Sequence, residues 1–464
     1  MILKLGLLPL GRPTFDVPFA EEKLAAMCAA LDATGHEIAG PRTLLFDAGA
    51  TEAAIADLQA AGIDQLLILQ VTFTDASMTV AAAHAFPDTP LSLWAVPEPR
   101  LGGRLRLNAF CGLNLASHAL GRAERGFGWL FADPAGDVAA DLKSMLAGHR
   151  PSGRMRPHGN AMRTTPEAED IADRIATRRI ARIGAHPDGF TTCAYDPDEI
   201  ERLAGVTVDE IPLERLFDDA RALPEGAEAA VRAAAEAQMT DLDSVDQAEL
   251  TRSLRLKTAL DGLRAQGDYD AFAIRCWPET FTEYGGAVCG PVAMMGEARV
   301  PCACEADVYG ALTQLVLQET AQDPVFLADL VDIDTADGTG VVWHCGQAPI
   351  SMRDPDVAAT ATVHTNRRMP LLYEFPLKPG RVTFLRISQA FGRPKMVIAA
   401  GEMLKRPMAF TGTSGVVRFD NPAGQVLADV IASGLEHHVA LAYGDHRQAL
   451  RDVAGAMHLP VMEL

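Results

Sequence analysis

Short apolar segments and segments with helical spacing alternate through the first 150 residues of the chain. The runs Gln65–Val71 and Leu91–Val96 are almost entirely apolar, whereas Phe19–Thr34 and Thr51–Ala61 repeat apolar residues at helical spacing. Apolar strands without polar alternation are typical of a parallel sheet that is buried on both faces. Strands and helices that alternate in this way predict a doubly wound α/β domain, which we place at residues 1–155.

The rest of the chain divides into two further parts. Residues 156–322 repeat the α/β pattern, with a central strand at Asp270–Trp277 and long helical runs between 213 and 265. Alternating β-rich segments dominate residues 323–464 and indicate an antiparallel barrel or sandwich. The Pro-, Gly- and Arg-rich segment Gly148–Gly159 marks the first boundary. The sequence thus predicts two N-terminal α/β domains and a β-rich, barrel-like C-terminal domain.

The composition limits which binding partners and which cellular location we expect. A net charge of −20 argues against nucleic acid or an anionic membrane, since both select basic surfaces. No segment reaches the roughly 18 apolar residues of a membrane span. Residues 1–11 lack the features of a signal peptide, so we expect a cytoplasmic protein. The eight cysteines include no CxxC pair, which argues against structural zinc and predicts buried, reduced thiols.

Two carboxylates lie in strongly apolar surroundings. Glu305 stands where an apolar segment turns into the helical run Asp307–Gln318, and Asp329 lies inside the apolar segment Val325–Ile333. Charges in such places are costly unless they are paired or bind a metal. For Glu305, a position that stabilises the helix N-terminus is an equally good interpretation. For Asp329, the alternative is a place at a strand edge or a turn.

Three histidines complete a candidate cation site. His344 ends a strand-like segment, where it is either a ligand or a core residue, and His437 and His438 precede the strand Val439–Tyr443. If that segment is extended, only one of the two neighbours can face a given pocket. Two carboxylates and an imidazole suit Mn²⁺, Fe²⁺, Co²⁺ or Mg²⁺. The spacing alone leaves open whether these side chains converge.

A family resemblance rests on the spacing of the two acids. Glu305, in Cys304-Glu-Ala-Asp-Val308, and Asp329, in Phe326-Leu-Ala-Asp329, lie 24 positions apart. The chain resembles the L-fucose isomerase and L-arabinose isomerase superfamily, in which a Thr-Glu-Asn-Asp-Val segment and a Phe-Ala-Asp segment have this spacing. His437–Gly444, followed by a helix and Leu459-Pro-Val461, matches the C-terminal Asn-His segment of the family without a gap.

The resemblance implies roles for individual residues. It implies that Glu305 and Asp329 are catalytic and that they bind a divalent cation, foremost Mn²⁺, together with His438. The remaining residues that it places at the sugar are His344, His437, Trp277 and Arg12. It also implies a homo-oligomer, a trimer or hexamer. The chain departs from the family pattern at His437, which replaces an Asn, and at Ala271–Trp277, which replaces a Gln-rich motif, so the sugar stays open.

The expected function is a metal-dependent aldose–ketose isomerase. Its substrate would be an open-chain pentose or hexose, or a derivative, which reacts through a cis-enediol. Two alternatives remain: a carbohydrate-binding protein without catalysis, since tandem α/β units also resemble sugar receptors, and a metal-dependent sugar epimerase or lyase.

Overall fold

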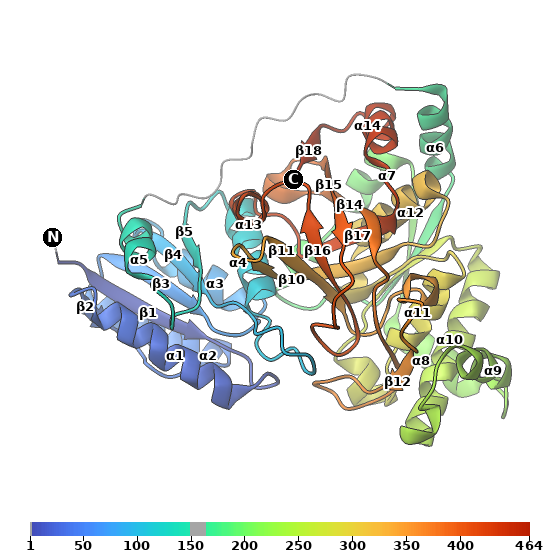
Figure 1. Ribbon diagram of the computed structural model, residues 1–464, viewed down its shortest axis with the longest axis horizontal. Coiled ribbons are helices and arrows are strands. Elements are labelled where there is room, and N and C mark those ends of the chain that lie inside the picture. The colour runs from blue at the N-terminus through green and yellow to red at the C-terminus, as the bar shows by residue number, and fades with distance from the viewer. Residues whose placement is uncertain (1, 149–163) are drawn as a thin grey trace.

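Three sheets organise the molecule, which is described here by a computed structural model that covers residues 2–148 and 164–464. Figure 1 shows the N-terminal α/β unit in blue and cyan at the left and the second α/β unit in green and yellow at the right. The orange and red strands of the C-terminal part lie between them (Figure 1).

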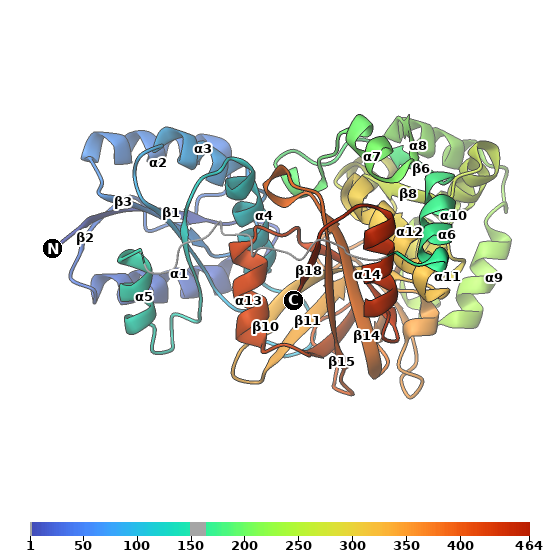
Figure 2. The same ribbon diagram turned by 90° about the horizontal axis from the view of Figure 1, so that it is seen from above.

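The N-terminal unit is a five-stranded parallel sheet of order β2-β1-β3-β4-β5 with helices on both faces. Its strands are β1 (Lys4–Leu10), β2 (Glu37–Ala39), β3 (Gln65–Gln70), β4 (Leu91–Ala95) and β5 (Gly128–Phe131). Its helices are α1 (Val17–Asp32), α2 (Ala48–Ala61), α3 (Ser77–Ala85), α4 (Ala109–Arg122) and α5 (Ala139–Leu146). Figure 2 shows α2 and α3 above the sheet and α1 and α5 below it. The side chains of Asp16 and Asp47 cap the N-termini of α1 and α2, and β3 is buried along its whole length.

The second unit has a four-stranded parallel sheet of order β7-β6-β8-β9. Its strands are β6 (Arg179–Ile183), β7 (Thr207–Ile211), β8 (Ala271–Ile274) and β9 (Cys302–Ala303). Its helices are α6 (Pro166–Ala176), α7 (Pro197–Ala204), α8 (Leu213–Ala222), α9 (Ala229–Gln238), α10 (Gln247–Gly267), α11 (Cys289–Glu297) and α12 (Val308–Ala321). These two units confirm the predicted α/β architecture with parallel sheets.

The C-terminal part forms a nine-stranded sheet that closes partly into a ring, because β15 also pairs with β16. Its strands are β10 (Phe326–Asp334), β11 (Thr339–His344), β12 (Thr360–Thr362), β13 (Leu372–Pro376), β14 (Gly380–Ser388), β15 (Lys395–Met403), β16 (Thr413–Phe419), β17 (His438–Tyr443) and β18 (Val461–Glu463). Its helices are α13 (Ala423–Ala432) and α14 (Arg447–Ala456). The strands of the ring are antiparallel, as predicted, whereas the outer strands β13 and β18 add parallel pairs.

Two buried helices connect the sheets. All residues of α4 from Ala109 to Gly121 are buried, and α4 packs against its own sheet, against β10 and against α13, which lies beside it in Figure 2. Helix α12 packs between β8 of the second unit and strands β14 and β17 of the ring. An ion pair of 2.7 Å between Arg100 and Asp332 adds a polar link from the N-terminal unit to β10. These contacts between the sheets position their strand ends relative to one another.

Three further features bear on the sequence-based expectations. In the described part of the chain, no helix is both long and apolar enough to cross a membrane. All eight cysteines are free thiols, and seven of them are buried. The predicted boundary segment Gly148–Gly159 lies outside the described residues from position 149 onward.

Candidate active site

A cavity of about 860 Å³ lies where the three parts of the chain meet. The N-terminal unit lines it with Arg12, Thr14, Phe15, Phe73, Leu105 and Asn108. The second unit contributes Cys276, Trp277, Phe281, Cys289, Cys304 and Glu305. The C-terminal part contributes Asp329, Trp343, His344, Cys345, Gln347, His364, Thr365, Asn366, Arg367 and His437. Six of the seven site residues predicted from the sequence line this cavity directly.

Glu305 is presented by a strained turn. It lies in a short 3₁₀ turn (Cys304–Ala306) between β9 and α12, with a φ of 58°, in the left-handed region that non-glycine residues rarely adopt. The residue that caps α12 is Asp307, whose side chain accepts the Gly310 N–H, so the helix-cap interpretation of Glu305 is wrong. The turn leaves the Glu305 carboxylate free to face the cavity.

Two aromatic side chains hold the Glu305 carboxylate. Trp277 Nε1 donates to Oε1 at 3.1 Å, and His437 Nε2 lies 3.0 Å from Oε2. Burial alone would raise the pKa of Glu305, but the hydrogen bond to His437 and the nearby imidazoles lower it to about 2. The carboxylate is therefore ionised in the buried site.

Asp329 and His438 face each other across two strands. They are direct partners in the antiparallel pair of β10 and β17, and His438 Nε2 lies 3.5 Å from Asp329 Oδ1. Both atoms are buried without a hydrogen-bond partner in the described structure. Glu305 Oε2 lies 3.8 Å from the same His438 nitrogen. His438 Nε2 thus has carboxylate oxygens from two other segments at 3.5 and 3.8 Å, a proximity that the sequence spacing left open.

Both neighbouring histidines reach the site. The rings of His437 and His438 lie 4.0 Å apart, centroid to centroid, and each approaches Glu305. Of the two, only His437 is among the residues that line the cavity, and it lies in a bend just before β17, which begins at His438. His344 is the third imidazole, and its Nδ1 accepts the backbone N–H of Cys345 at 2.8 Å. A neutral His344 with this contact carries its proton on Nε2.

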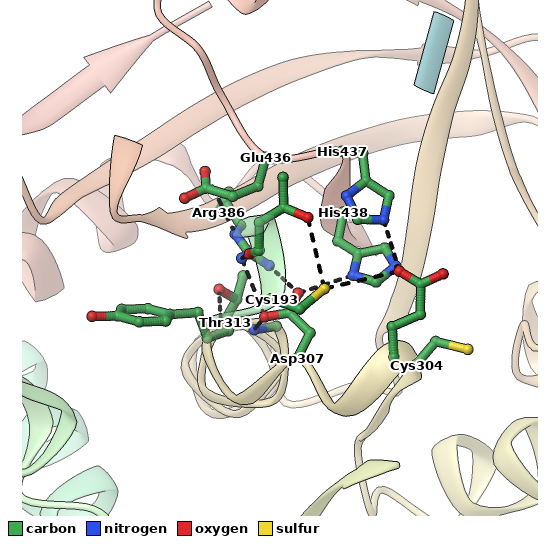
Figure 3. A network of polar contacts seen from close by, with 12 residues as sticks. Cys193, Cys304, Asp307, Thr313, Arg386, Glu436, His437 and His438 are labelled. Atoms are coloured by element: carbon green, nitrogen blue, oxygen red, sulfur yellow. Dashed lines mark hydrogen bonds and ion pairs between the residues drawn. The ribbon is translucent and has the colours of Figure 1, made fainter. Parts of the chain in front are cut away.

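A buried ion-pair network contacts the Nδ1 side of the His438 ring (Figure 3). His438 Nδ1 lies 2.9 Å from Asp307 Oδ2, so a neutral His438 donates from Nδ1 to this carboxylate and directs its Nε2 lone pair toward Asp329 and Glu305. Arg386 makes two contacts to the same carboxylate, at 2.6 and 3.2 Å, and its Nε lies 3.8 Å from Glu436. Burial opposes ionisation of Asp307, yet Arg386 and His438 hold the pKa of Asp307 well below its usual range. The network fixes the tautomer and the direction of His438.

The donor set fits a divalent cation. The ligand atoms of Asp329, His344 and His438 lie within 4.8 Å of one another, and so do those of Cys193, Glu305, His437 and His438. The carboxylates of Glu305 and Asp329 each lie near His438 Nε2, and a cation bound there would offset their charges. The unpartnered Asp329 Oδ1 and His438 Nε2 point to the same place. Two oxygens and one nitrogen with open positions are typical ligands of Mn²⁺, Fe²⁺ or Mg²⁺ sites.

Three residues at the site were not found from the sequence. Asp307 was detectable, because it is the second acid of the Glu305 motif and lies at a helix start. The Cys193 thiol lies 3.8 Å from Glu305 Oε2, and no sequence signal marks it. Arg367 belongs to an ordinary loop sequence, and only the tertiary structure places it in the cavity.

Comparisons with known proteins match both ends of the chain to one group of enzymes. Residues 6–155 match the N-terminal domain of fucose/sulfoquinovose isomerases, and residues 343–464 match the C-terminal domain of L-fucose isomerase. The sulfoquinovose isomerases of Priestia megaterium (strain ATCC 12872 / QMB1551) and of Alkalicoccus urumqiensis are each 29% identical to the chain, over 452 and 458 residues. These alignments cover 97% and 98% of both partners, respectively. The sulfoquinovose isomerase of Clostridium sp. (strain MSTE9) is also 29% identical, over 457 residues and 97% of both chains.

The fold, the site and these matches define the protein as a sugar isomerase, an enzyme that interconverts an aldose and a ketose. The two matched domains cover more than half of the chain, and the relatives align along almost all of it. The chain belongs to the fucose/sulfoquinovose isomerase family.

Proposed function

We propose that the chain is a metal-dependent aldose–ketose isomerase that acts on a sulfonated hexose through a cis-enediol. Glu305, Asp329 and His438 would hold the divalent cation, with Mn²⁺ as the first candidate. The observation that carries this proposal is the pair of unpartnered, buried atoms Asp329 Oδ1 and His438 Nε2, 3.5 Å apart beside the Glu305 carboxylate.

The proposed chemistry divides between the cation and the side chains. When bound, the cation supplies Lewis-acid polarisation of the sugar carbonyl. One of the two carboxylates, Glu305 or Asp329, takes the C2 proton of the open-chain aldose and returns it to C1, while the hydroxyl proton moves from O2 to O1. His437 and Trp277 keep Glu305 in position, since each contacts one of its oxygens. His344, with its proton on Nε2, is placed to donate to a sugar oxygen.

The proposed substrate class comes from the relatives, which are named for sulfoquinovose, a hexose with a sulfonate at C6. The cavity supports an anionic sugar because two guanidinium groups, those of Arg12 and Arg367, line it. The sequence left two other functions open. The isomerase matches leave no support for a carbohydrate-binding protein without catalysis. An epimerase or lyase reaction stays testable by its product.

Product analysis in deuterated water tests the proposed reaction. We expect the enzyme, supplied with Mn²⁺, to convert sulfoquinovose into its 2-ketose, and NMR to show deuterium at C1 or C2 when the enediol proton exchanges. Glucose, fucose and arabinose serve as comparison substrates. An epimeric aldose without a ketose, or loss of water from the sugar, would contradict the isomerase proposal.

Replacement of Asp307 by Asn should weaken metal binding without removing a ligand. The substitution keeps the shape and the helix cap but removes the charge that orients His438 Nε2. Loss of the side chain that hydrogen-bonds a metal-binding histidine typically lowers metal affinity about 10- to 100-fold. Isothermal titration with Mn²⁺ should therefore show a loss of that size. Circular dichroism of the metal-free variant checks that it is folded.

A matched control variant distinguishes a lost orientation of His438 from a general disturbance of the buried ion-pair network. Glu436 belongs to the same network, near Arg386, but does not contact His438. Glu436→Gln removes one buried carboxylate, as Asp307→Asn does, and should leave the Mn²⁺ affinity close to that of the wild type. Equal affinities in both variants and the wild type would show that Asp307 does not orient the ligand.

The oligomeric state remains a proposal that rests on the resemblance. A trimer or hexamer is the expected assembly. Within one chain, Arg12, Phe15 and Phe73 of the N-terminal unit already line the cavity that holds Glu305. A single chain therefore supplies residues from all three of its parts to its own candidate site.

A further inference from the structure

Two arginine side chains flank one indole ring in the cavity. The Cζ atom of Arg12 lies 5.4 Å from the ring centroid of Trp277, and that of Arg367 lies 5.8 Å from it. Arg12 follows β1 of the N-terminal unit, whereas Arg367 lies in the loop between β12 and β13 of the C-terminal part. The tertiary structure thus brings two cations from opposite ends of the chain to the same place.

Only one of the two cations has a carboxylate partner. Arg12 forms an ion pair with Asp75 at 2.5 Å. Among the described residues, no carboxylate lies within ion-pair distance of the half-buried Arg367, whose contacts are the Trp277 ring and a backbone hydrogen bond to His364. Burial and the adjacent Arg12 both lower the pKa of Arg367, which reflects an uncompensated positive charge. The arrangement leaves a net charge of about +1 facing the cavity.

Trp277 contacts both this charge and the proposed proton-transfer site. Trp277 contacts the guanidinium groups with its ring and donates its Nε1–H to Glu305 at 3.1 Å. One indole ring therefore separates the proton-transfer site from the two arginines. An extended six-carbon chain spans roughly 6 Å between its ends. A sugar with C1 and C2 beside Glu305 can thus place its C6 substituent at the arginines.

We propose that Arg12 and Arg367, arranged around Trp277, form an anion subsite for the C6 sulfonate and that Arg367 is its specificity-determining residue. This inference rests on the proposed function and identifies the residues that select its substrate class. Guanidinium groups bind oxyanions through paired N–H donors. A single uncompensated charge is best matched by a monoanion such as a sulfonate. A phosphate monoester carries about −1.5 to −2 at pH 7 and would leave excess negative charge in a half-buried place.

The first test measures discrimination between sugars. We define the specificity ratio as kcat/KM for sulfoquinovose divided by kcat/KM for 6-deoxyglucose, which lacks the sulfonate. Arg367→Gln should lower this ratio by roughly 30- to 300-fold, the size expected when a charged partner of an ionic contact is removed. Arg368→Gln is the matched control, because Arg368 is the exposed neighbour of Arg367 and does not line the cavity, and it should leave the ratio unchanged. An unchanged ratio in Arg367→Gln would overturn the inference.

The second test does not depend on turnover. Ethanesulfonate should raise the thermal stability of the wild type and of Arg368→Gln, and this shift should be lost in Arg367→Gln. Equal shifts in all three proteins, or no shift in the wild type, would overturn the subsite. Should the wild type isomerise neither sugar, the proposed function fails, and the ethanesulfonate shifts still decide the subsite separately.

Discussion

Replacement of Asp329 by Asn, or of Glu305 by Gln, is expected to lower kcat for isomerisation by about 10³-fold or more. Proton transfer by a positioned carboxylate alone contributes about 10²- to 10⁴-fold, and each of these acids is also proposed to hold the cation. The amides keep nearly the same volume, and the amide oxygen introduced by Glu305→Gln can still accept the hydrogen bond from Trp277 Nε1. Steady-state kinetics with Mn²⁺ and the substrate identified by NMR measure the effect.

Stability measurements separate a chemical loss from unfolding. Asn keeps the shape of the Asp329 side chain, so circular dichroism of the metal-free Asp329→Asn variant should show the folded spectrum of the wild type. Asp334→Asn is the control on the same strand, because Asp334 lies at the end of β10 and accepts only local N–H groups. Near wild-type turnover in both active-site variants would contradict the proposed roles of Glu305 and Asp329.

Removal of the divalent cation is the second large effect that we expect. Chelation should lower the activity by about 10³-fold, because Lewis-acid stabilisation of developing negative charge is worth several kcal/mol. Addition of Mn²⁺ should restore it, while a sample dialysed without chelator keeps its activity. Elemental analysis relates activity to bound metal. Full activity in a preparation that contains no detectable metal would refute a metal-dependent mechanism.

The pH dependence of metal binding follows from His438. Burial lowers the pKa of His438, but its hydrogen bond to Asp307 and the nearby carboxylates raise it to about 9 in the metal-free protein. A cation that binds at Nε2 must displace that proton, so the apparent metal affinity should fall by about tenfold per pH unit below pH 9. Titration calorimetry in buffers of different ionisation enthalpy should show release of about one proton at pH 7.

The raised pKa of His438 also determines how the folding stability of the metal-free protein depends on pH. The folded-state pKa of His438 lies above its ordinary value of 6.5, so its ion pair stabilises the metal-free protein fully below pH 6.5. This contribution is lost as the pH rises through about 9. Metal-free protein should therefore lose thermal stability between pH 6.5 and 9, while the stabilisation by added Mn²⁺ should grow over the same range. Parallel pH profiles with and without metal would contradict this assignment.

The fold was largely predictable because its signals are local. Apolar strands such as Gln65–Val71 and helices such as Phe19–Thr34 depend on neighbours in sequence, and the structure has a strand and a helix at these places. The acid motifs were also recognisable from their 24-residue spacing. Closure of the ring was less accessible, because the pairing of β15 with β16 joins segments whose register no local pattern specifies.

The geometry of the candidate site depends on contacts that local sequence patterns do not predict. The approach of both His437 and His438 to Glu305 depends on a bend just before β17, which no local sequence pattern specified. Asp307 was visible as an acid, but its contact with His438 arises only when α12 packs against β17. The approach of Arg367 to Trp277 depends on a loop between two strands, whose conformation is set by contacts far away in sequence.

The amino-acid sequence by itself determined the α/β units, the β-rich C-terminal part and the identities of Glu305 and Asp329 as unusual buried acids. Periodicity and short motifs are enough for these, because they report the environment of each residue. Only the tertiary structure decided that the carboxylates of Glu305 and Asp329 both lie near His438 Nε2 and that an arginine without a carboxylate partner among the described residues lies beside Trp277. The physical reason is that distances across the cavity depend on strand register and helix packing between all three sheets, and no segment of the chain encodes those distances alone.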